Sequence, residues 1–180
     1  MSLPNKNSSN DLLIDFPEVR QTTDYSCGAS ALQAILYYYG LSYREDQLIE
    51  ILRSNHNAGT PPSNIVTYCR KLGFIVIEKQ HMTIDDIRYY LKQKIPILVA
   101  YQVSGASNTC QNGHYSVIIG LQGDKLIFDD PAIIGKGFIR IADFFRRWYD
   151  CDIYGQQYVR YGIMIYGARI KYNSKKLTLL

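Results

Sequence analysis

Residues 21–40 read QTTDYSCGASALQAILYYYG, a polar and turn-rich start followed by an almost continuously apolar stretch. The change falls at Cys27-Gly28, and the apolar residues after it cover nearly every face of a helix. That pattern is typical of a helix surrounded by protein. Gly40 stands where a glycine ends a helix in a left-handed turn. We therefore predict a central, buried helix that begins at Cys27.

Cys27 is a candidate nucleophile because of its place in this helix. Unpaired backbone N–H groups at a helix N-terminus carry partial positive charge, which favours the thiolate over the thiol. A lone cysteine on an apolar helix is more often an inert packing residue. Gln21 favours the catalytic interpretation, because its side-chain amide and the backbone N–H of Cys27 together would form an oxyanion hole.

An acyl-transfer cysteine also needs a proton acceptor and a group that orients this acceptor. The chain has three histidines. His56 lies in the polar run SNHN and His81 in a connection before Thr83, so we interpret both as loop residues. His114 instead begins the β-type run HYSVIIGL, and Asp130 ends the next such run.

Residues 122–125, QGDK, separate these two runs, and Gly-Asp between apolar segments predicts a β-hairpin. An antiparallel hairpin brings the start of its first strand beside the end of its second, so His114 and Asp130 would be neighbours. Side chains alternate along a strand, which places Asp130 on one face and Asp129 on the other. We predict Asp130 as the orienting carboxylate, with Asp129 as the alternative.

The chain resembles the bacteriocin-processing cysteine peptidases, a papain-like family that removes double-glycine leader peptides. The resemblance runs from about Gln21 to Tyr149 and rests on four features: Gln21-x5-Cys27-Gly28 with small residues after it, the Tyr-Tyr-Gly end of the helix, Gly113-His114-Tyr115 and Asp130-Pro131-Ala132. It implies that Cys27 is the nucleophile, His114 the general base and Asp130 the orienting acid, with Gln21 in the oxyanion hole. Exporter-fused members usually have an acidic residue before the nucleophile, where this chain has Ser26.

The remaining patterns predict an α+β fold. Helices are expected after a capping box at residues 42–45, over residues 60–72, after a cap at Thr83 and over residues 143–148, and strands at residues 74–78, 97–103, 137–141 and 161–166. A helical half would pack against an antiparallel sheet half, with the active-site cleft between them, as in papain-like peptidases. We expect one such domain over residues 17–180, after a flexible segment of residues 1–16.

Composition limits the other function classes. Net charge is +4, and the basic residues are spread along the chain, so nucleic acid is not indicated as a partner. Sixteen tyrosines fit core positions better than a base-stacking surface. The N-terminus has no signal-peptide pattern, and no apolar run approaches the roughly 18 residues of a membrane helix. No cofactor or metal is expected, and the oligomeric state stays open.

The chain has four cysteines, Cys27, Cys69, Cys110 and Cys151, without the C-x-x-C spacing of a zinc or redox site. If Cys27 is the nucleophile, an odd number remains. Extensive disulfide bonding is therefore not expected, and a reducing, cytoplasmic location fits.

The favoured function is a cysteine peptidase that acts on a peptide or protein substrate, with cleavage after a small-residue or Gly-Gly site as one option. Two alternatives stay open: a catalytically silent papain-like module that only binds peptides, and an amide hydrolase or isopeptidase with a different substrate.

Overall fold

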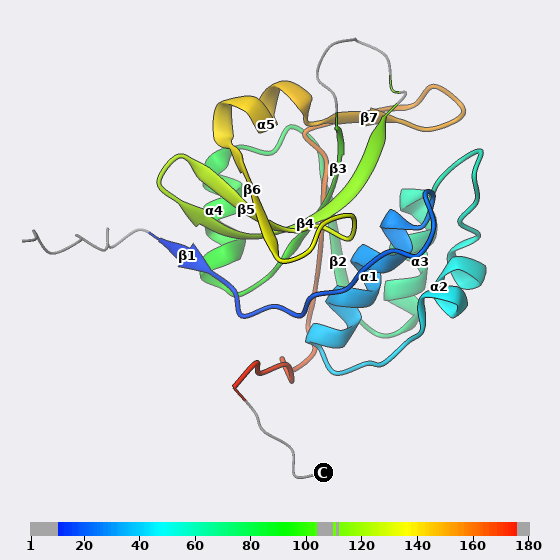
Figure 1. Cartoon of the computed structure of the whole chain (residues 1–180), viewed down its shortest axis with the longest axis horizontal. Coiled ribbons are helices and arrows are strands. Elements are labelled where there is room, and N and C mark those ends of the chain that lie inside the picture. Colours follow the sequence, from blue (N-terminus) through cyan, green and yellow to red (C-terminus); the bar gives the residue numbers. More distant parts are fainter. Residues whose placement is uncertain (1–10, 104–109, 111, 176–180) are drawn as a thin grey trace, which may run out of the picture.

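The helix that carries Cys27 forms as the sequence predicts. The computed structural model describes residues 11–103, 110 and 112–175, and in it α1 spans Cys27–Tyr38. Ten of its twelve residues are buried, because α1 lies between strand β4 and helix α2 (Figure 1). Gly40 follows with φ of 81°, the left-handed conformation expected at a helix end.

The sheet half is antiparallel, as predicted. Its strands are β1 Leu12–Leu13, β2 Ile75–Lys79, β3 Ile97–Gln102, β4 Gly113–Gln122, β5 Lys125–Asp129, β6 Lys136–Arg140 and β9 Gly162–Tyr166. They are ordered β2-β9-β3-β4-β5-β6, with β1 paired to β4, and β7 Tyr149–Cys151 and β8 Gln157–Val159 form a separate pair. The β4–β5 hairpin turns at Gly123, whose φ is 57°, so the Gly-Asp prediction is confirmed.

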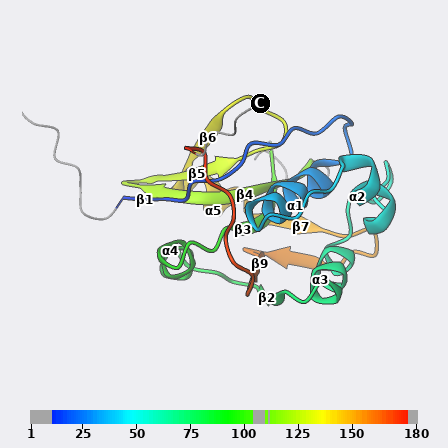
Figure 2. The same cartoon turned by 90° about the horizontal axis from the view of Figure 1, so that it is seen from below.

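The helices are α2 Glu45–Leu52, α3 Pro62–Lys71, α4 Ile84–Lys92 and α5 Ile141–Arg147, besides α1. Figures 1 and 2 show α1, α2 and α3 grouped together, while α4 and α5 lie apart from this group, by the sheet. The α+β prediction is confirmed. However, β2 and α4 come early in the chain and still belong to the sheet half, so the two halves do not follow sequence order.

The N-terminal boundary lies earlier than predicted. Leu12 and Leu13 pair with Leu121 and Gly120 of β4, and Ile14 and Phe16 are 5% and 4% exposed. A side chain at Gly120 would bring its Cβ within 2.8 Å of the Leu12 carbonyl, so the glycine permits this pairing. The expectation of a flexible segment is thus wrong for residues 11–16, and residues 1–10 lie outside the described part.

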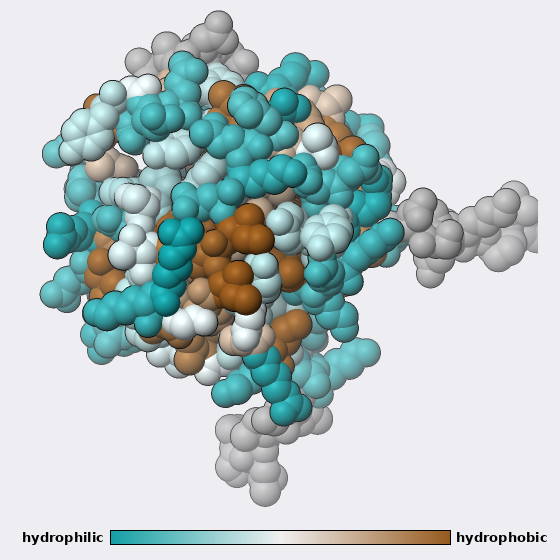
Figure 3. All heavy atoms as spheres, turned by 180° about the vertical axis from the view of Figure 1, so that it is seen from behind, coloured by the Kyte–Doolittle hydropathy of each residue, from teal (hydrophilic) through white to brown (hydrophobic). Residues whose placement is uncertain are grey.

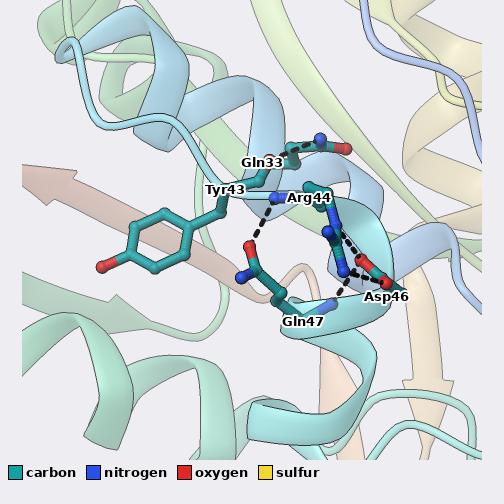
Figure 4. A network of polar contacts seen from close by, with 5 residues as sticks. All are labelled: Gln33, Tyr43, Arg44, Asp46 and Gln47. Atoms are coloured by element: carbon teal, nitrogen blue, oxygen red, sulfur yellow. Dashed lines mark hydrogen bonds and ion pairs between the residues drawn. The ribbon is translucent and has the colours of Figure 1, made fainter.

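The start of α2 also differs from the prediction. Ser42 does not cap it; instead the backbone N–H of Arg44 donates to Oε1 of Gln47 at 3.0 Å, and Arg44 pairs with Asp46 (Figure 4). Gln33 of α1 donates to the Tyr43 carbonyl at 2.7 Å, which ties this turn to the central helix. A polar residue near a helix start is therefore not necessarily its cap.

An aromatic cluster supports the sheet where α5 covers it. Phe144 of α5 lies 5.6 Å from Tyr101, 5.2 Å from Phe128 and 4.8 Å from Trp148, measured between ring centroids. Trp148 is 1% exposed and donates its indole N–H to the Tyr161 carbonyl at 2.9 Å. These rings support the ends of β3 and β5.

The cysteines form one disulfide, between Cys110 and Cys151, with the Cα atoms 5.6 Å apart. Cys27 and Cys69 are free and buried. Extensive disulfide bonding is not present, as expected, but the single bond removes the cysteine-based argument for a reducing compartment.

The surface is mixed in polarity. Figure 3 shows apolar residues gathered on the face opposite to that of Figure 1. On the edge strand β2, Ile75 is 53% exposed. Among residues 11–103, 110 and 112–175, no helix has both the length and the apolar character needed to cross a membrane.

Candidate active site

His114 and Asp130 meet at the open end of the β4–β5 hairpin. His114 is the second residue of β4, and Asp130 directly follows β5. Nε2 of His114 lies 2.8 Å from Oδ1 of Asp130, and their side chains are only 12% and 10% exposed. The neighbourhood predicted from the hairpin is therefore present.

Cys27 reaches the same imidazole from the helical half. Its side chain is near enough to raise the pKa of His114, and because Nε2 faces Asp130, Nδ1 is the ring nitrogen left for the sulfur. Gly28 allows this approach: a Cβ there would lie 2.6 Å from Cβ of Thr60 and 3.0 Å from the ring of Tyr115. The first turn of α1 therefore packs directly against β4 and the residues before α3.

The electrostatics of this cluster favour charged forms. Burial disfavours the imidazolium, but hydrogen bonds and negative charges from Asp130 and Cys27 raise the pKa of His114 to about 9. Burial likewise opposes ionisation of Asp130, yet hydrogen bonds from His114, the Ala132 N–H and Tyr101 lower its pKa. At neutral pH an imidazolium thus lies between a carboxylate and the sulfur of Cys27.

Tyr101 is a member of the site that the sequence analysis missed. Its hydroxyl donates to Oδ2 of Asp130 at 3.2 Å, and its ring stands edge-on to His114 with centroids 5.9 Å apart. Burial and the Asp130 charge raise the pKa of Tyr101, so the phenol keeps the proton that it donates. Tyr101 is the cross-strand partner of His114, and strand pairing would have been the signal that points to it.

Asp129 points away from the histidine, as side-chain alternation predicts. Its carboxylate binds Nζ of Lys136 at 2.7 Å, and Lys136 also donates to the carbonyls of Phe16 and Pro17. Asp129 is 2% exposed, and burial raises its pKa to about 6 despite the ion pair. It anchors the N-terminal segment, and Asp130 is the carboxylate that contacts His114.

Gln21 lies between the two halves. Its backbone N–H donates to the Pro131 carbonyl at 3.0 Å, next to Asp130, and Nε2 donates to the Thr23 carbonyl at 2.8 Å. An amide nitrogen has two hydrogens, so one remains for another acceptor. As the first helical residue, Cys27 has a backbone N–H without an acceptor inside its helix. The oxyanion hole itself stays a prediction.

The other two histidines lie outside this cluster. His56 is exposed, with Nδ1 3.3 Å from Asp24 and its ring tilted against that of Tyr25, and His81 is exposed with φ of 53° in the connection before α4. Within the described residues, no three His, Cys, Asp or Glu side chains are grouped so that they could hold a metal ion.

A cavity of about 300 Å³ adjoins the strand that carries His114. Its lining comes from β7, β8 and the disulfide: Cys110, Tyr149, Asp150, Cys151, Gln157 and Val159. Asp150 contacts Gly113, since a Cβ on this glycine would lie 2.7 Å from both carboxylate oxygens. The cavity therefore lies beside the residue that precedes His114 in β4.

Comparison with known sequences gives two matches. Residues 15–155 match the sequence model of the Peptidase C39 family. Over 138 residues, or 76% of this chain, the sequence is 25% identical to the mesentericin-Y105 transport/processing ATP-binding protein MesD of Leuconostoc mesenteroides. The match covers 18% of that protein, so the chain spans about a fifth of this relative's length.

Solved structures share the fold. The peptidase domain of Streptococcus ComA, a bi-functional ABC transporter, is 24% identical with a TM-score of 0.63, and the match covers 82% of this chain and 95% of that one. A double glycine motif protease from an AMS/PCAT transporter, solved with its leader peptide, is 18% identical with a TM-score of 0.61 (85% and 92% covered). A C39-like peptidase from Bacillus anthracis is 15% identical with a TM-score of 0.67 (89% and 99% covered).

Proposed function

Because this chain belongs to the peptidase C39 family and is a cysteine peptidase, we propose that Cys27, His114 and Asp130 form its catalytic triad. The observation that carries the proposal is the contact of His114 Nε2 with Oδ1 of Asp130 at 2.8 Å, on an imidazole whose pKa Cys27 also raises. A nucleophile, a base bonded to it and a third group that orients the base are the parts that acyl transfer needs.

In the proposed reaction the thiolate of Cys27 attacks the carbonyl carbon of the scissile peptide bond. The negative charge moves to the carbonyl oxygen, where the free amide hydrogen of Gln21 and the backbone N–H of Cys27 would bind it. His114 gives its proton to the leaving amine. It then takes a proton from the water that attacks the acyl-enzyme, and Cys27 leaves as thiolate. Asp130 keeps the imidazole oriented throughout.

The proposed substrate is a peptide with a leader segment, cut after a small-residue or Gly-Gly site. Two relatives support it by their descriptions: MesD is a transport/processing protein, and one structural match was solved as a double glycine motif protease with a leader peptide. We also propose the cytoplasm as the location. The Cys110–Cys151 disulfide would be open to reduction there and does not support this location.

Incubation with synthetic leader peptides, their Gly-Gly→Ala-Ala variants and a general peptide library, read by mass spectrometry, tests the substrate. We expect cleavage after Gly-Gly that Cys27→Ala abolishes. Cleavage of isopeptide-linked substrates alone would instead support the isopeptidase alternative, and binding of peptides without any cleavage would support the silent module.

Brief iodoacetamide treatment at about pH 7, followed by peptide mapping, tests the nucleophile separately. Cys27 should be alkylated first, because it lies at the N-terminus of α1 and beside a positively charged His114. Cys69 is the matched control, since it is also free and buried, and burial raises its pKa to about 12. Equal labelling of Cys27 and Cys69 would contradict the assignment.

A further inference from the structure

Residues 20–23, which precede the nucleophile, contain buried polar atoms without hydrogen-bond partners in the described part of the chain. Nη1 of Arg20, Oε1 of Gln21 and Oγ1 of Thr23 are buried without a hydrogen-bond partner in the described part of the chain. A buried polar atom without a partner destabilises the fold. Hydrogen bonds from other elements of the fold are therefore needed to hold residues 20–23 in place.

Glu45, the first residue of α2, supplies such bonds. The backbone N–H of Thr22 donates to both of its carboxylate oxygens, at 2.9 and 3.2 Å. The Ser30 hydroxyl donates to Oε1 at 2.8 Å. Ser30 lies on α1, three residues after Cys27, and is fully buried. One carboxylate thus joins the residue after Gln21 to the helix of the nucleophile.

The carboxylate of Glu45 accepts hydrogen bonds from these donors and forms no ion pair in the described part of the chain. Burial opposes its ionisation, but hydrogen bonds from Ser26, Thr22 and Ser30 lower its pKa, so the carboxylate is charged at neutral pH. Its neighbour Arg44 is engaged with Asp46 (Figure 4). Among residues 11–103, 110 and 112–175, no basic side chain lies within 4.0 Å of Glu45.

Gln21 is consequently held from two directions. On one side its backbone N–H binds the Pro131 carbonyl, and on the other its neighbour Thr22 binds Glu45. We propose that Glu45 is a positioning residue, which fixes the Gln21 amide beside Cys27 in the geometry that binds the oxyanion. This inference rests on the proposed function, because it assumes acyl transfer at Cys27.

The test compares Glu45→Gln and Glu45→Ala with Asp46→Asn, a matched control in the same turn whose carboxylate pairs only locally with Arg44 and the Gln47 N–H. Glu45→Ala should lower kcat about 10-fold with little change in KM, less than the roughly 10²–10³-fold expected on losing an oxyanion donor. Glu45→Gln keeps one acceptor oxygen and should lie between Glu45→Ala and the wild type. Iodoacetamide labelling of Cys27 should not change, since the contact with His114 is untouched.

A double-mutant cycle with Gln21→Ala identifies the residue through which Glu45 acts. If Glu45 positions Gln21, Glu45→Ala should cost almost nothing further once Gln21 is alanine. An equal loss in both backgrounds would overturn the proposal. If Glu45→Ala lowered the melting temperature and left kcat unchanged, the proposal would also be overturned, because Glu45 would then only stabilise the fold.

Hydrogen exchange of the Thr22 amide gives a readout that needs no activity. It should be slow in the wild type and in Asp46→Asn, and faster in Glu45→Ala; unchanged protection would refute the inference. Cleavage that survives Cys27→Ala would refute the proposed function and the inference together. Cleavage that needs Cys27 but neither Gln21 nor Glu45 would refute the inference alone.

Discussion

Replacement of Cys27 by alanine should lower the pKa of His114. On folding, that pKa rises from its ordinary 6.5 to about 9, and Cys27 contributes to the rise both a hydrogen bond and a negative charge. This rise in pKa corresponds to roughly 3 kcal/mol of stabilisation of the protonated ring, at about 1.4 kcal/mol per pKa unit. Because the pKa is raised, this stabilisation is fully present below about pH 6.5 and is lost as the pH rises through about 9.

NMR titration of the histidine ring protons measures the effect directly. In the wild type the His114 signal should titrate near pH 9. In Cys27→Ala its midpoint should fall towards or below 6.5, because only Asp130 then opposes the lowering of the His114 pKa by burial. Assignment would use His114→Gln, and the exposed His56 and His81 serve as internal references. Cys27→Ser is the matched control, because it keeps a hydrogen-bonding group but no anion at these pH values. A midpoint near 6.5 in the wild type, unmoved by Cys27→Ala, would refute the influence of Cys27 on the His114 ring.

Four further substitutions separate catalysis from folding. Tyr101→Phe removes the hydrogen bond to Asp130 and should lower kcat roughly 10-fold, the rate equivalent of about 1.4 kcal/mol, with KM nearly unchanged in steady-state assays. Gly28→Ala places a Cβ 2.6 Å from that of Thr60, so overpacking should cost about 1–3 kcal/mol in chemical denaturation. Asp129→Ala breaks a largely buried ion pair and should cost about 2 kcal/mol of stability, while Asp130→Ala should abolish most turnover; the reverse pattern in rates would mean that the wrong carboxylate was assigned.

The parts of the site that the sequence predicts are those fixed by local patterns. Helix α1 begins at Cys27 because the apolar run begins there, and the Gly-Asp turn brings His114 beside Asp130 through the register of one hairpin. Alternation along β5 was enough to separate Asp129 from Asp130. Each of these inferences depends on residues that are close in sequence or joined by a short turn.

The missed contacts come from tertiary packing. Glu45 binds Thr22 across 23 positions, and no local pattern distinguishes it from an ordinary acidic residue in a first helical turn. Cys110 pairs with Cys151, 41 positions away on β7, a strand that contacts β3. Strand β1 has two residues, too few for periodicity to predict it.

The position of β9 has a consequence for synthesis on the ribosome. This strand is made after the other strands of its sheet, yet it pairs with both β2 and β3 and so fills an interior place in the sheet. Until residue 166 has left the exit tunnel, β2 has no partner strand and one edge of β3 is open over half its length. A nascent chain therefore holds Cys27, His114 and Asp130 long before the sheet beneath them is complete. We expect translation intermediates stalled before β9 to lack peptidase activity, which delays cleavage of any neighbouring polypeptide until β9 has been added to the sheet.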